Sequence, residues 1–257
     1  MDDWFTVDKI DDTTWVISEY GHWEQVHSYL LIGKSQAALI DTGMGVKSIK
    51  QIVDKLTELP VQVVLTHAHW DHIGDANEFE KVSIHQADSD WLEHGLPISD
   101  EIIHKNFAKE PTTKALPADF NLATYSTPKV KPTSILKDGE NVDLGDRQLQ
   151  IIYTPGHSPG GICILDTSKD YLFTGDMIYK GTLFMNYEST DPVAFADSIK
   201  KLSRLKGVKL VLPSHNETPL DPSVIRETEI AFDELRRKDQ LKHGSGLHSF
   251  GEIKVLI

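Results

Sequence analysis

Three histidines and one aspartate lie within six consecutive residues, in the run Thr66-His67-Ala68-His69-Trp70-Asp71-His72. Histidine is neutral near pH 7 and can donate a ring lone pair to zinc or iron, and a carboxylate can supply an oxygen ligand. The run directly follows the apolar residues 61–65, which predict a buried strand. Ligands at the end of a strand are brought together by local structure alone. We therefore interpret His67, His69, Asp71 and His72 as metal ligands.

Three more candidate ligands occupy similar settings in the second half of the chain. His157, Asp176 and His215 each follow an apolar run and a turn residue. The two groups together give seven potential ligands, five imidazoles and two carboxylates. Such a set is large enough for two divalent metal ions that share a bridging carboxylate and a bridging water. Zinc is the default expectation for nitrogen and oxygen ligands, and iron and manganese accept the same set.

The elements that must position these residues repeat a pattern of strands followed by a helix. The first half predicts a helix over residues 46–59 and a helical stretch over 87–92, and the second half predicts helices opened by Asp191-Pro192 and Asp221-Pro222. Two such halves, with ligands at strand ends, predict an α/β fold: a four-layer αββα sandwich with the site along one edge of the sheets. The predicted strands are residues 4–7, 14–17, 27–32, 37–40, 61–65, 82–84, 148–153, 162–165, 171–173, 209–212 and 251–257.

Residues 95–132 interrupt this pattern. They contain five prolines and scattered aromatic residues and show no sustained hydrophobic period. We interpret them as an inserted, partly helical cap. Long insertions of this kind are often lids over a site, and a surface excursion that covers part of the core is the alternative.

The composition limits the class of protein. A chain of 257 residues with 39% apolar and 25% charged residues fits one globular domain over residues 1–257. Its 26 basic and 39 acidic residues give a formal charge of −13, which repels phosphate backbones, so no nucleic-acid partner is expected. The single cysteine, Cys163, excludes an internal disulfide and is expected in the core.

The location and partners follow from what the chain lacks. The amino-terminal residues Met1-Asp2-Asp3-Trp4 carry no secretory signal, and no apolar run reaches the roughly 20 residues that span a bilayer. We therefore expect a cytoplasmic enzyme that acts on a small molecule and has no membrane partner. A homodimer is one option for its assembly.

The motifs, taken in order, resemble those of the metallo-β-lactamase-fold hydrolase superfamily. His67-x-His69-x-Asp71-His72 is followed by Gly156-His157, Gly175-Asp176 and His215, and Asp41-Thr42-Gly43 precedes them. The resemblance covers nearly the whole chain and implies an αββα sandwich with a dinuclear site. It assigns one metal to His67, His69 and His157, the other to Asp71, His72 and His215, and the bridging position to Asp176.

The reaction that this resemblance implies is hydrolysis by a metal-bound hydroxide. Two metal ions lower the pKa of a shared water, polarise the electrophilic oxygen and receive the leaving alkoxide. Asp71 is expected to orient that water or to shuttle its proton. Tyr179 stands where the acyl-homoserine lactonases that this chain resembles have a tyrosine whose hydroxyl contacts the substrate carbonyl, which predicts an oxyanion donor. We expect a lactone or carboxylic ester as substrate, and simple packing is the alternative role of Tyr179.

Five further residues are candidates for the substrate pocket. His22 and Trp23 lie between two predicted strands, where the tip of a hairpin can come close to the metals. Trp70 lies inside the ligand motif, His85 ends a predicted strand, and Phe184 adds to an apolar wall suited to an acyl chain or ring. An ordinary structural or core role is the alternative for each of them.

Other reactions of the same superfamily compete with this hypothesis. A phosphodiesterase or phosphorylcholine esterase would use the same metal set, and a persulfide dioxygenase would bind one iron through two histidines and an aspartate. True β-lactamases are disfavoured because Asp176 is present and Cys163 is not at a ligand position. A glyoxalase II-like thioesterase is disfavoured because the 42 residues after His215 lack a recognisable basic pattern. Ribonucleases and flavo-diiron proteins fit less well, and a binding module without turnover is the non-enzymatic alternative.

Overall fold

The computed structural model describes residues 4–257, which form two compact units. The first unit runs to Leu136 and includes Leu144–Asp146, and the second comprises Lys137–Asp143 and Arg147–Ile257. The first unit contains one sheet and the second contains two, and each unit has its own hydrophobic core. One domain over residues 1–257 with an insertion stays a prediction. Met1, Asp2 and Asp3, on which the interpretation of the amino terminus partly rests, lie outside the described residues.

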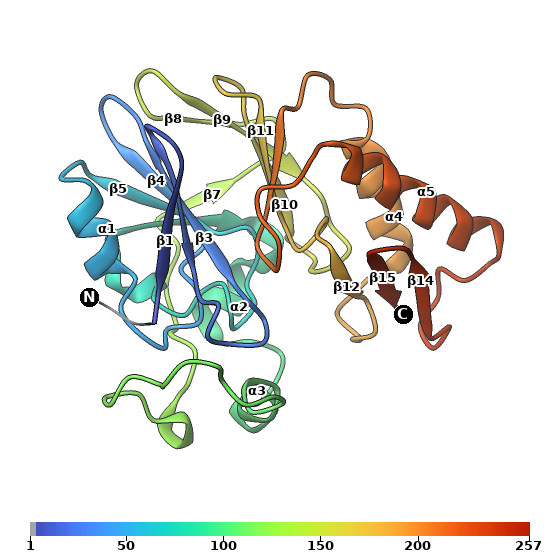
Figure 1. Ribbon diagram of the computed structural model, residues 1–257, viewed down its shortest axis with the longest axis horizontal. Coiled ribbons are helices and arrows are strands. Elements are labelled where there is room, and N and C mark those ends of the chain that lie inside the picture. The colour runs from blue at the N-terminus through green and yellow to red at the C-terminus, as the bar shows by residue number, and fades with distance from the viewer. Residues whose placement is uncertain (1–3) are drawn as a thin grey trace. The chain divides into compact units, whose positions relative to one another are not determined.

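The first unit is built on a seven-stranded sheet in the order β1 to β7 (Figure 1). The strands from β1 to β4 pair antiparallel, and those from β4 to β7 pair parallel. The carboxyl ends of the parallel strands therefore meet at one edge of the sheet, where Asp41 follows β4 and the histidine run follows β5. The strands are β1 (Thr6–Asp11), β2 (Thr14–Ser18), β3 (His27–Ile32), β4 (Ala37–Ile40), β5 (Val61–Val64), β6 (Lys81–His85) and β7 (Ser134–Leu136).

The helix between β4 and β5 is shorter than predicted. It is α1 (Lys50–Leu56), whereas the pattern indicated residues 46–59. Gly43 and Gly45 have positive φ angles of 67° and 69°, and the Ile49 amide donates to the Asp75 carboxylate at 2.6 Å, so turns occupy the residues before α1. The other helical elements before residue 95 are η1 (Ala76–Glu78), η2 (Gln86–Asp88) and α2 (Ser89–His94).

The segment 95–132 is partly helical, in agreement with the sequence pattern. It contains α3 (Asp100–Phe107), capped by the Ser99 side chain, and the short turn η3 (Leu122–Thr124). Ile103 and Phe107 of α3 are buried in the hydrophobic core of the first unit. The segment thus covers core residues of its own unit, and a lid function stays a prediction.

The second unit contains two sheets. One has the order β13-β11-β10-β9-β8 and the other β12-β15-β14. In the first of them β11 and β13 pair parallel, which places their carboxyl ends side by side. The strands are β8 (Asn141–Asp143), β9 (Gln148–Tyr153), β10 (Ile162–Asp166), β11 (Tyr171–Gly175), β12 (Gly181–Phe184), β13 (Leu210–Pro213), β14 (Leu247–Phe250) and β15 (Ile253–Leu256). The strands β8, β12 and β14, like β7 of the first unit, were not predicted.

Two helices pack side by side in the second unit (Figure 1). They are α4 (Pro192–Leu202) and α5 (Ser223–Arg237). The Asp191 side chain accepts the amides of Val193 and Ala194, and Pro192 occupies the first turn of α4, which confirms the predicted start. The rings of Phe195 and Phe232 stack between the helices with centroids 4.9 Å apart.

The buried cysteine belongs to the core of the second unit. Cys163 on β10 is fully buried, and this burial raises the pKa of its thiol to about 12. A protonated thiol is a poor metal ligand, which agrees with the interpretation of Cys163 as a core residue. None of the helices within residues 4–257 combines the length and the apolar character needed to cross a membrane.

Candidate metal centre

In the first unit the predicted ligands lie together in the loop after β5. His67 Nε2 is 3.0 Å from His69 Nδ1, and His72 Nε2 is 3.5 Å from Asp71 Oδ2. The ring centroids of His67 and His72 are 4.1 Å apart. All four side chains belong to groups that can hold a metal ion. We call these residues the first ligand cluster.

Asp41 orients two imidazoles of this cluster. His72 Nδ1 lies 3.0 Å from Asp41 Oδ2, and the Thr66 hydroxyl donates to the same oxygen at 2.8 Å. Because that hydroxyl uses its proton on Asp41, it accepts from His67 Nδ1 at 3.0 Å. Both rings therefore carry their proton on Nδ1, and Nε2 of each ring is left to donate a lone pair to a metal.

Backbone contacts hold the cluster against the turn that follows Asp41. The Thr42 amide donates to the His72 carbonyl at 2.7 Å, and the Gly74 amide donates to the Gly43 carbonyl at 2.8 Å. A Cβ on Gly74 would lie 2.1 Å from the Gly45 nitrogen. A residue with a side chain does not fit at this crossing, so the motif needs glycine three residues after Asp71.

Buried carboxyl groups support the same turn. Burial raises the pKa of Glu19 to about 7, although the indole of Trp4 donates to it at 2.6 Å and the Met44 amide at 2.8 Å. Burial also raises the pKa of Asp75 to about 8. Both side chains fix backbone amides near the first ligand cluster, and neither was predicted from the sequence.

In the second unit the remaining ligands converge on one oxygen atom. His157 Nε2 lies 3.3 Å and His215 Nε2 lies 3.1 Å from Asp176 Oδ2. Asp176 directly follows β11 and His215 follows β13. These strands pair parallel up to Gly175 and Pro213, with a register shift after Phe173, so both side chains leave the sheet at the same edge. These three residues form the second ligand cluster, and each belongs to a group that can hold a metal ion.

The turn before β10 positions His157. Its Nδ1 donates to the carbonyl of Phe184 at 3.2 Å, which leaves Nε2 as the lone-pair donor. Gly156 has a φ angle of 139°, and a Cβ there would lie 2.4 Å from the backbone of Phe195. Glycine is therefore required immediately before this ligand.

The donor sets fit divalent metal ions. Tetrahedral coordination with bonds of about 2.0–2.2 Å separates neighbouring ligand atoms by roughly 3.3–3.6 Å. The separations within the two clusters, 3.0 to 3.5 Å, lie close to this range. Neutral imidazole nitrogens and carboxylate oxygens are the donors that such ions accept. The structure thus supports the prediction that these histidines and aspartates bind divalent metals.

The sequence matches the Metallo-beta-lactamase superfamily over residues 21–241. This chain belongs to that superfamily. It is therefore a metal-dependent hydrolase, and the prediction of the fold is confirmed. Solved structures agree: the chain matches a metallo-beta-lactamase from Pontibacter korlensis with a TM-score of 0.65 at 19% identity, covering 89% of this chain and 99% of that one. A superfamily protein from Sulfolobus tokodaii, ST1585, matches with a TM-score of 0.58 at 24% identity over 82% of this chain and 81% of that chain.

Relatives with curated names point to hydrolysis. The chain is 29% identical to the acyl-coenzyme A thioesterase MBLAC2 of Homo sapiens over 234 residues, which are 84% of this chain and 82% of the relative. It is 28% identical to the probable metallo-hydrolase YqgX of Bacillus subtilis over 61% of this chain and 68% of that protein.

The two pocket candidates near the amino terminus, His22 and Trp23, contact the segment 95–132. His22 Nδ1 accepts the Glu24 amide at 3.2 Å, so Nε2 carries the proton and donates to the Phe107 carbonyl at 2.9 Å. The Trp23 indole donates to the Asn106 carbonyl at 3.0 Å. Both residues thus bind carbonyls at the end of α3, and a role in a substrate pocket stays a prediction for them.

The other candidates have structural contacts as well. Trp70 is buried beside Phe107, with ring centroids 6.1 Å apart, and His85 accepts the Ala87 amide at 3.3 Å. Tyr179 is buried, and its hydroxyl donates to the Thr182 carbonyl at 2.5 Å. As an oxyanion donor Tyr179 would have to exchange this bond for one to substrate. The pocket roles of Trp70, His85 and Phe184 and the catalytic roles of Asp71 and Tyr179 stay predictions.

Proposed function

We propose that this hydrolase cleaves a carboxylic thioester or ester, with acyl thioesters as its preferred substrates. The observation that carries the proposal is the similarity to acyl-coenzyme A thioesterases over more than four-fifths of both chains, at 29% identity. A thioester and a carboxylic ester present the same electrophilic acyl carbon, so the proposal keeps the chemistry that the sequence predicted. The 42 residues after His215 lack the basic pattern expected of a glyoxalase II-like thioesterase. This argues only against glutathione as the thiol of the substrate.

The ligand clusters supply the conditions for this reaction. When bound, divalent ions at such ligands lower the pKa of a coordinated water and polarise a carbonyl oxygen. The contribution of the chain is to hold the imidazole protons: Asp41 and Thr66 fix Nδ1–H of His72 and His67, and the Phe184 carbonyl fixes that of His157. In the reaction the oxygen of water bonds to the acyl carbon, the carbon–sulfur bond breaks, and a carboxylate, a thiol and one proton result.

Zinc is the metal that we propose for both positions, with the ligand assignment that the family resemblance implies. Neutral histidines with few carboxylates are typical of zinc sites. Metal analysis of the purified enzyme by mass spectrometry tests the identity. Iron at about one ion per chain together with oxygen consumption would instead indicate the dioxygenase reaction.

A comparison of three substrates tests the reaction. We expect kcat/KM to be higher for a long-chain acyl thioester than for an acyl-homoserine lactone, and lowest for bis(p-nitrophenyl) phosphate, with enzyme reconstituted with zinc or with manganese. The Asp176→Ala variant serves as the control for contaminating hydrolases. A faster rate on the phosphate diester than on either carbonyl substrate would refute the proposal. A preference for the lactone would retain the carbonyl chemistry and change the substrate class.

A further inference from the structure

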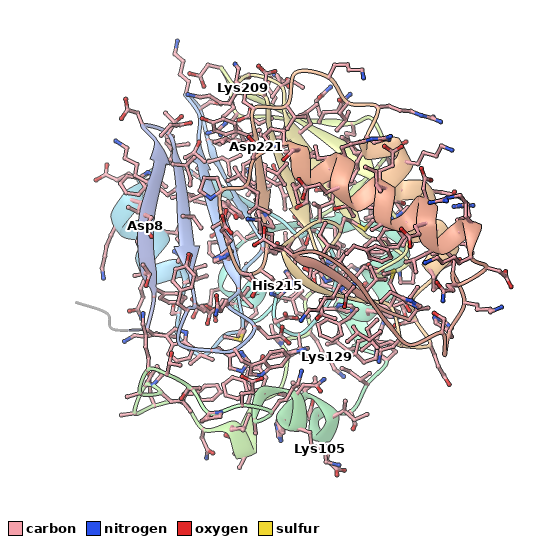
Figure 2. All side chains as sticks on the ribbon, turned by 45° about the vertical axis from the view of Figure 1, so that its right-hand side comes forward. Asp8, Lys105, Lys129, Lys209, His215 and Asp221 are labelled. Carbon is pink, nitrogen blue, oxygen red and sulfur yellow. The ribbon has the colours of Figure 1, made fainter. Side chains whose placement is uncertain are left out.

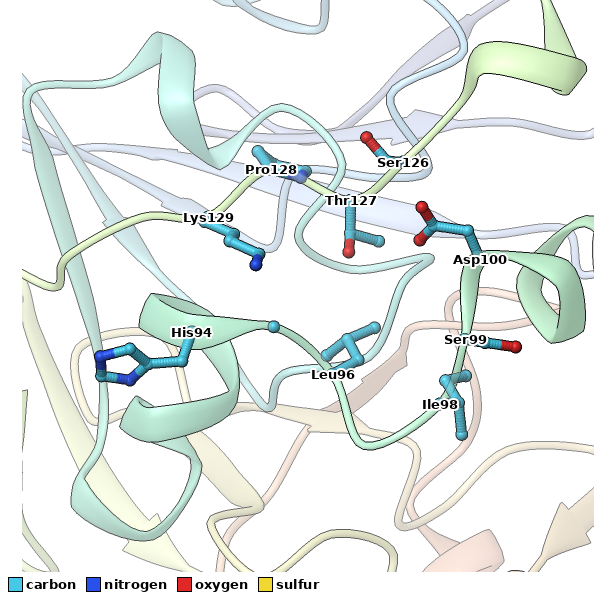
Figure 3. Close-up of a pocket in the computed structure, with 10 residues that line it drawn as sticks. His94, Leu96, Ile98, Ser99, Asp100, Ser126, Thr127, Pro128 and Lys129 are labelled. Atoms are coloured by element: carbon cyan, nitrogen blue, oxygen red, sulfur yellow. The ribbon is translucent and has the colours of Figure 1, made fainter.

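A polar cavity in the first unit lies outside the ligand clusters. Its volume is about 610 Å³, which is within the range of small-molecule sites. The end of α2, the start of α3 and residues 126–129 form its walls (Figure 3). Its lining includes a cation, a carboxylate and hydroxyl groups around an apolar floor: Lys129, Asp100, Ser126, Thr127 and Leu96.

The positive and negative groups of the cavity lie on opposite sides of it. Figure 3 shows the Lys129 ammonium and the Thr127 hydroxyl directed towards the cavity, the Asp100 carboxylate on the opposite side, and the His94 ring turned outward. His94 pairs with Asp90 at 3.0 Å, whereas within residues 4–257 no carboxylate forms an ion pair with Lys129. One side of the cavity therefore suits an anion, and the other suits hydroxyl or amide donors.

The local charge also favours an anionic ligand. Residues 95–132 contain five lysines and four acidic residues, a formal charge of +1 in a chain of −13. Figure 2 labels two of these lysines, Lys105 and Lys129, in this part of the chain. An anion that approaches an acidic protein is attracted to such a region.

One wall of the cavity contacts the first ligand cluster, and the other contacts the turn that supports this cluster. On α2 the Trp91 ring stacks on the His69 ring, with centroids 6.3 Å apart and planes inclined by 12°. On the facing wall the Tyr125 hydroxyl donates to the Met44 carbonyl at 2.7 Å, and the next residue, Ser126, lines the cavity. The Val130 amide joins the walls by donating to the Leu92 carbonyl at 2.9 Å.

The separation between cavity and cluster suits a linear carrier. The Trp91 ring lies 6.3 Å from the His69 ring, and four residues of helix from Trp91 to Gly95 advance about 6 Å, so the path from the His69 ring through Trp91 to the cavity is on the order of 12 Å. An extended chain covers about 1.2 Å per bond, so roughly ten bonds span this distance. A phosphopantetheine arm has at least that many bonds between its sulfur and its phosphorus, and it also carries hydroxyl and amide groups.

We propose that this cavity binds the phosphorylated carrier of an acyl thioester, with a phosphate at Lys129 and Thr127 and hydroxyl or amide donors at Asp100. The inference rests on the proposed function. It makes Lys129 a residue that determines specificity for the carrier and leaves the acyl chain to other parts of the enzyme.

Steady-state kinetics with two thioesters tests the role of Lys129. One substrate is an acyl-coenzyme A, and the other is the N-acetylcysteamine thioester of the same acyl group, which lacks phosphate. We expect Lys129→Ala to raise KM for acyl-coenzyme A roughly fivefold with little change in kcat, and to leave the second substrate unaffected. Added salt should raise KM for acyl-coenzyme A in the wild type and less in the variant.

The matched control is Lys131→Ala, which removes an exposed lysine two residues away that does not line the cavity. Equal effects of the two variants, or equal effects of Lys129→Ala on both substrates, would overturn the assignment. If the wild type hydrolyses neither thioester, the proposed function is wrong. The assignment of the cavity is then tested by ligand binding instead of by kinetics. Calorimetry with desulfo-coenzyme A then has to show weaker binding to Lys129→Ala than to the wild type, and unchanged binding refutes the site.

Discussion

Asp41 is the residue on which the first ligand cluster depends most directly. Its carboxylate accepts the amide and hydroxyl protons of Thr66 and the Nδ1 proton of His72. Through the Thr66 hydroxyl it also determines which nitrogen of His67 faces the metal. Carboxylates that orient metal-bound histidines typically contribute one to two orders of magnitude to metal affinity.

The substitution Asp41→Asn tests this role. The φ angle of residue 41 is +57°, a conformation that asparagine tolerates, so the backbone can be retained. The amide NH₂ cannot accept the His72 proton, and we expect the affinity for zinc to fall by roughly 10- to 100-fold. Competition with a chromogenic chelator measures the affinity, and Asp12→Asn at an exposed position is the control. Unchanged affinity in Asp41→Asn would contradict the assigned role.

Tyr179 is the one catalytic side chain that was predicted outside the metal ligands. Its substitution by phenylalanine tests that role. Its hydrogen bond to the Thr182 carbonyl favours a structural role. For Tyr179→Phe we therefore expect retained metal, a loss of stability of about 1 kcal/mol and a kcat within about threefold of the wild type. Denaturant unfolding and initial rates measure the two effects. A hundredfold loss of kcat on thioesters and lactones would instead establish the predicted oxyanion donor.

At the scale of elements, the start of α1 is held by a hydrogen bond to a side chain of the loop that contains the metal ligands. Asp75 accepts the amide of Ile49, the residue that precedes α1, at 2.6 Å and within a buried setting. Desolvation raises the pKa of this carboxyl from 3.8 to about 8. The protonated form therefore predominates in the folded state at neutral pH, whereas the unfolded chain has an ionised carboxylate there.

This difference predicts a pH dependence of stability. Between about pH 4 and pH 8 the folded protein binds a proton at Asp75 that the unfolded chain has released, so the contribution of Asp75 to the free energy of unfolding falls as pH rises. Asn can accept the Ile49 amide and cannot ionise. We expect the free energy of unfolding of the wild type to fall between pH 5 and pH 8 by an amount on the order of a few kcal/mol, and Asp75→Asn to remove this decline. Urea unfolding of metal-free protein at pH 5 and pH 8 measures it, and parallel declines in both proteins would contradict the prediction.

The metal ions act on the stability of the whole molecule. A ligand that binds only the folded state stabilises it by about 2.7 kcal/mol when its concentration is 100 times the dissociation constant. Chelation should therefore lower the Tm of the wild type by about 5–10 °C, given the size of the chain. Removal of the Asp176 carboxylate leaves His157 and His215 without their common contact.

We expect Asp176→Ala to contain less than one metal ion per chain, and its Tm to change little when a chelator is added. Metal analysis and thermal scans with and without chelator measure this. The control is Asp8→Ala, which changes an exposed residue of β1 (Figure 2) and should keep the full response. Normal metal content and rate in Asp176→Ala would refute the proposed dinuclear centre.

The sequence by itself determined the fold class, most strands and the residues that can bind metal. It could do so because the ligands follow a glycine turn or come shortly after the ends of β5, β11 and β13, and apolar runs mark those strands. Helix caps were predicted for the same reason, since Asp191 and Pro192 act on adjacent amides. All of these signals are local in the chain.

Only the tertiary structure decided how these residues are held. The Asp41 carboxylate lies 31 residues from His72, and Glu19 lies 25 residues from the Met44 amide that it accepts. The carbonyls of Phe184, Thr182 and Phe107 that bind His157, Tyr179 and His22 leave no mark in the sequence, because every residue has a carbonyl. The cavity beside α2 likewise depends on chain segments that become neighbours only on folding.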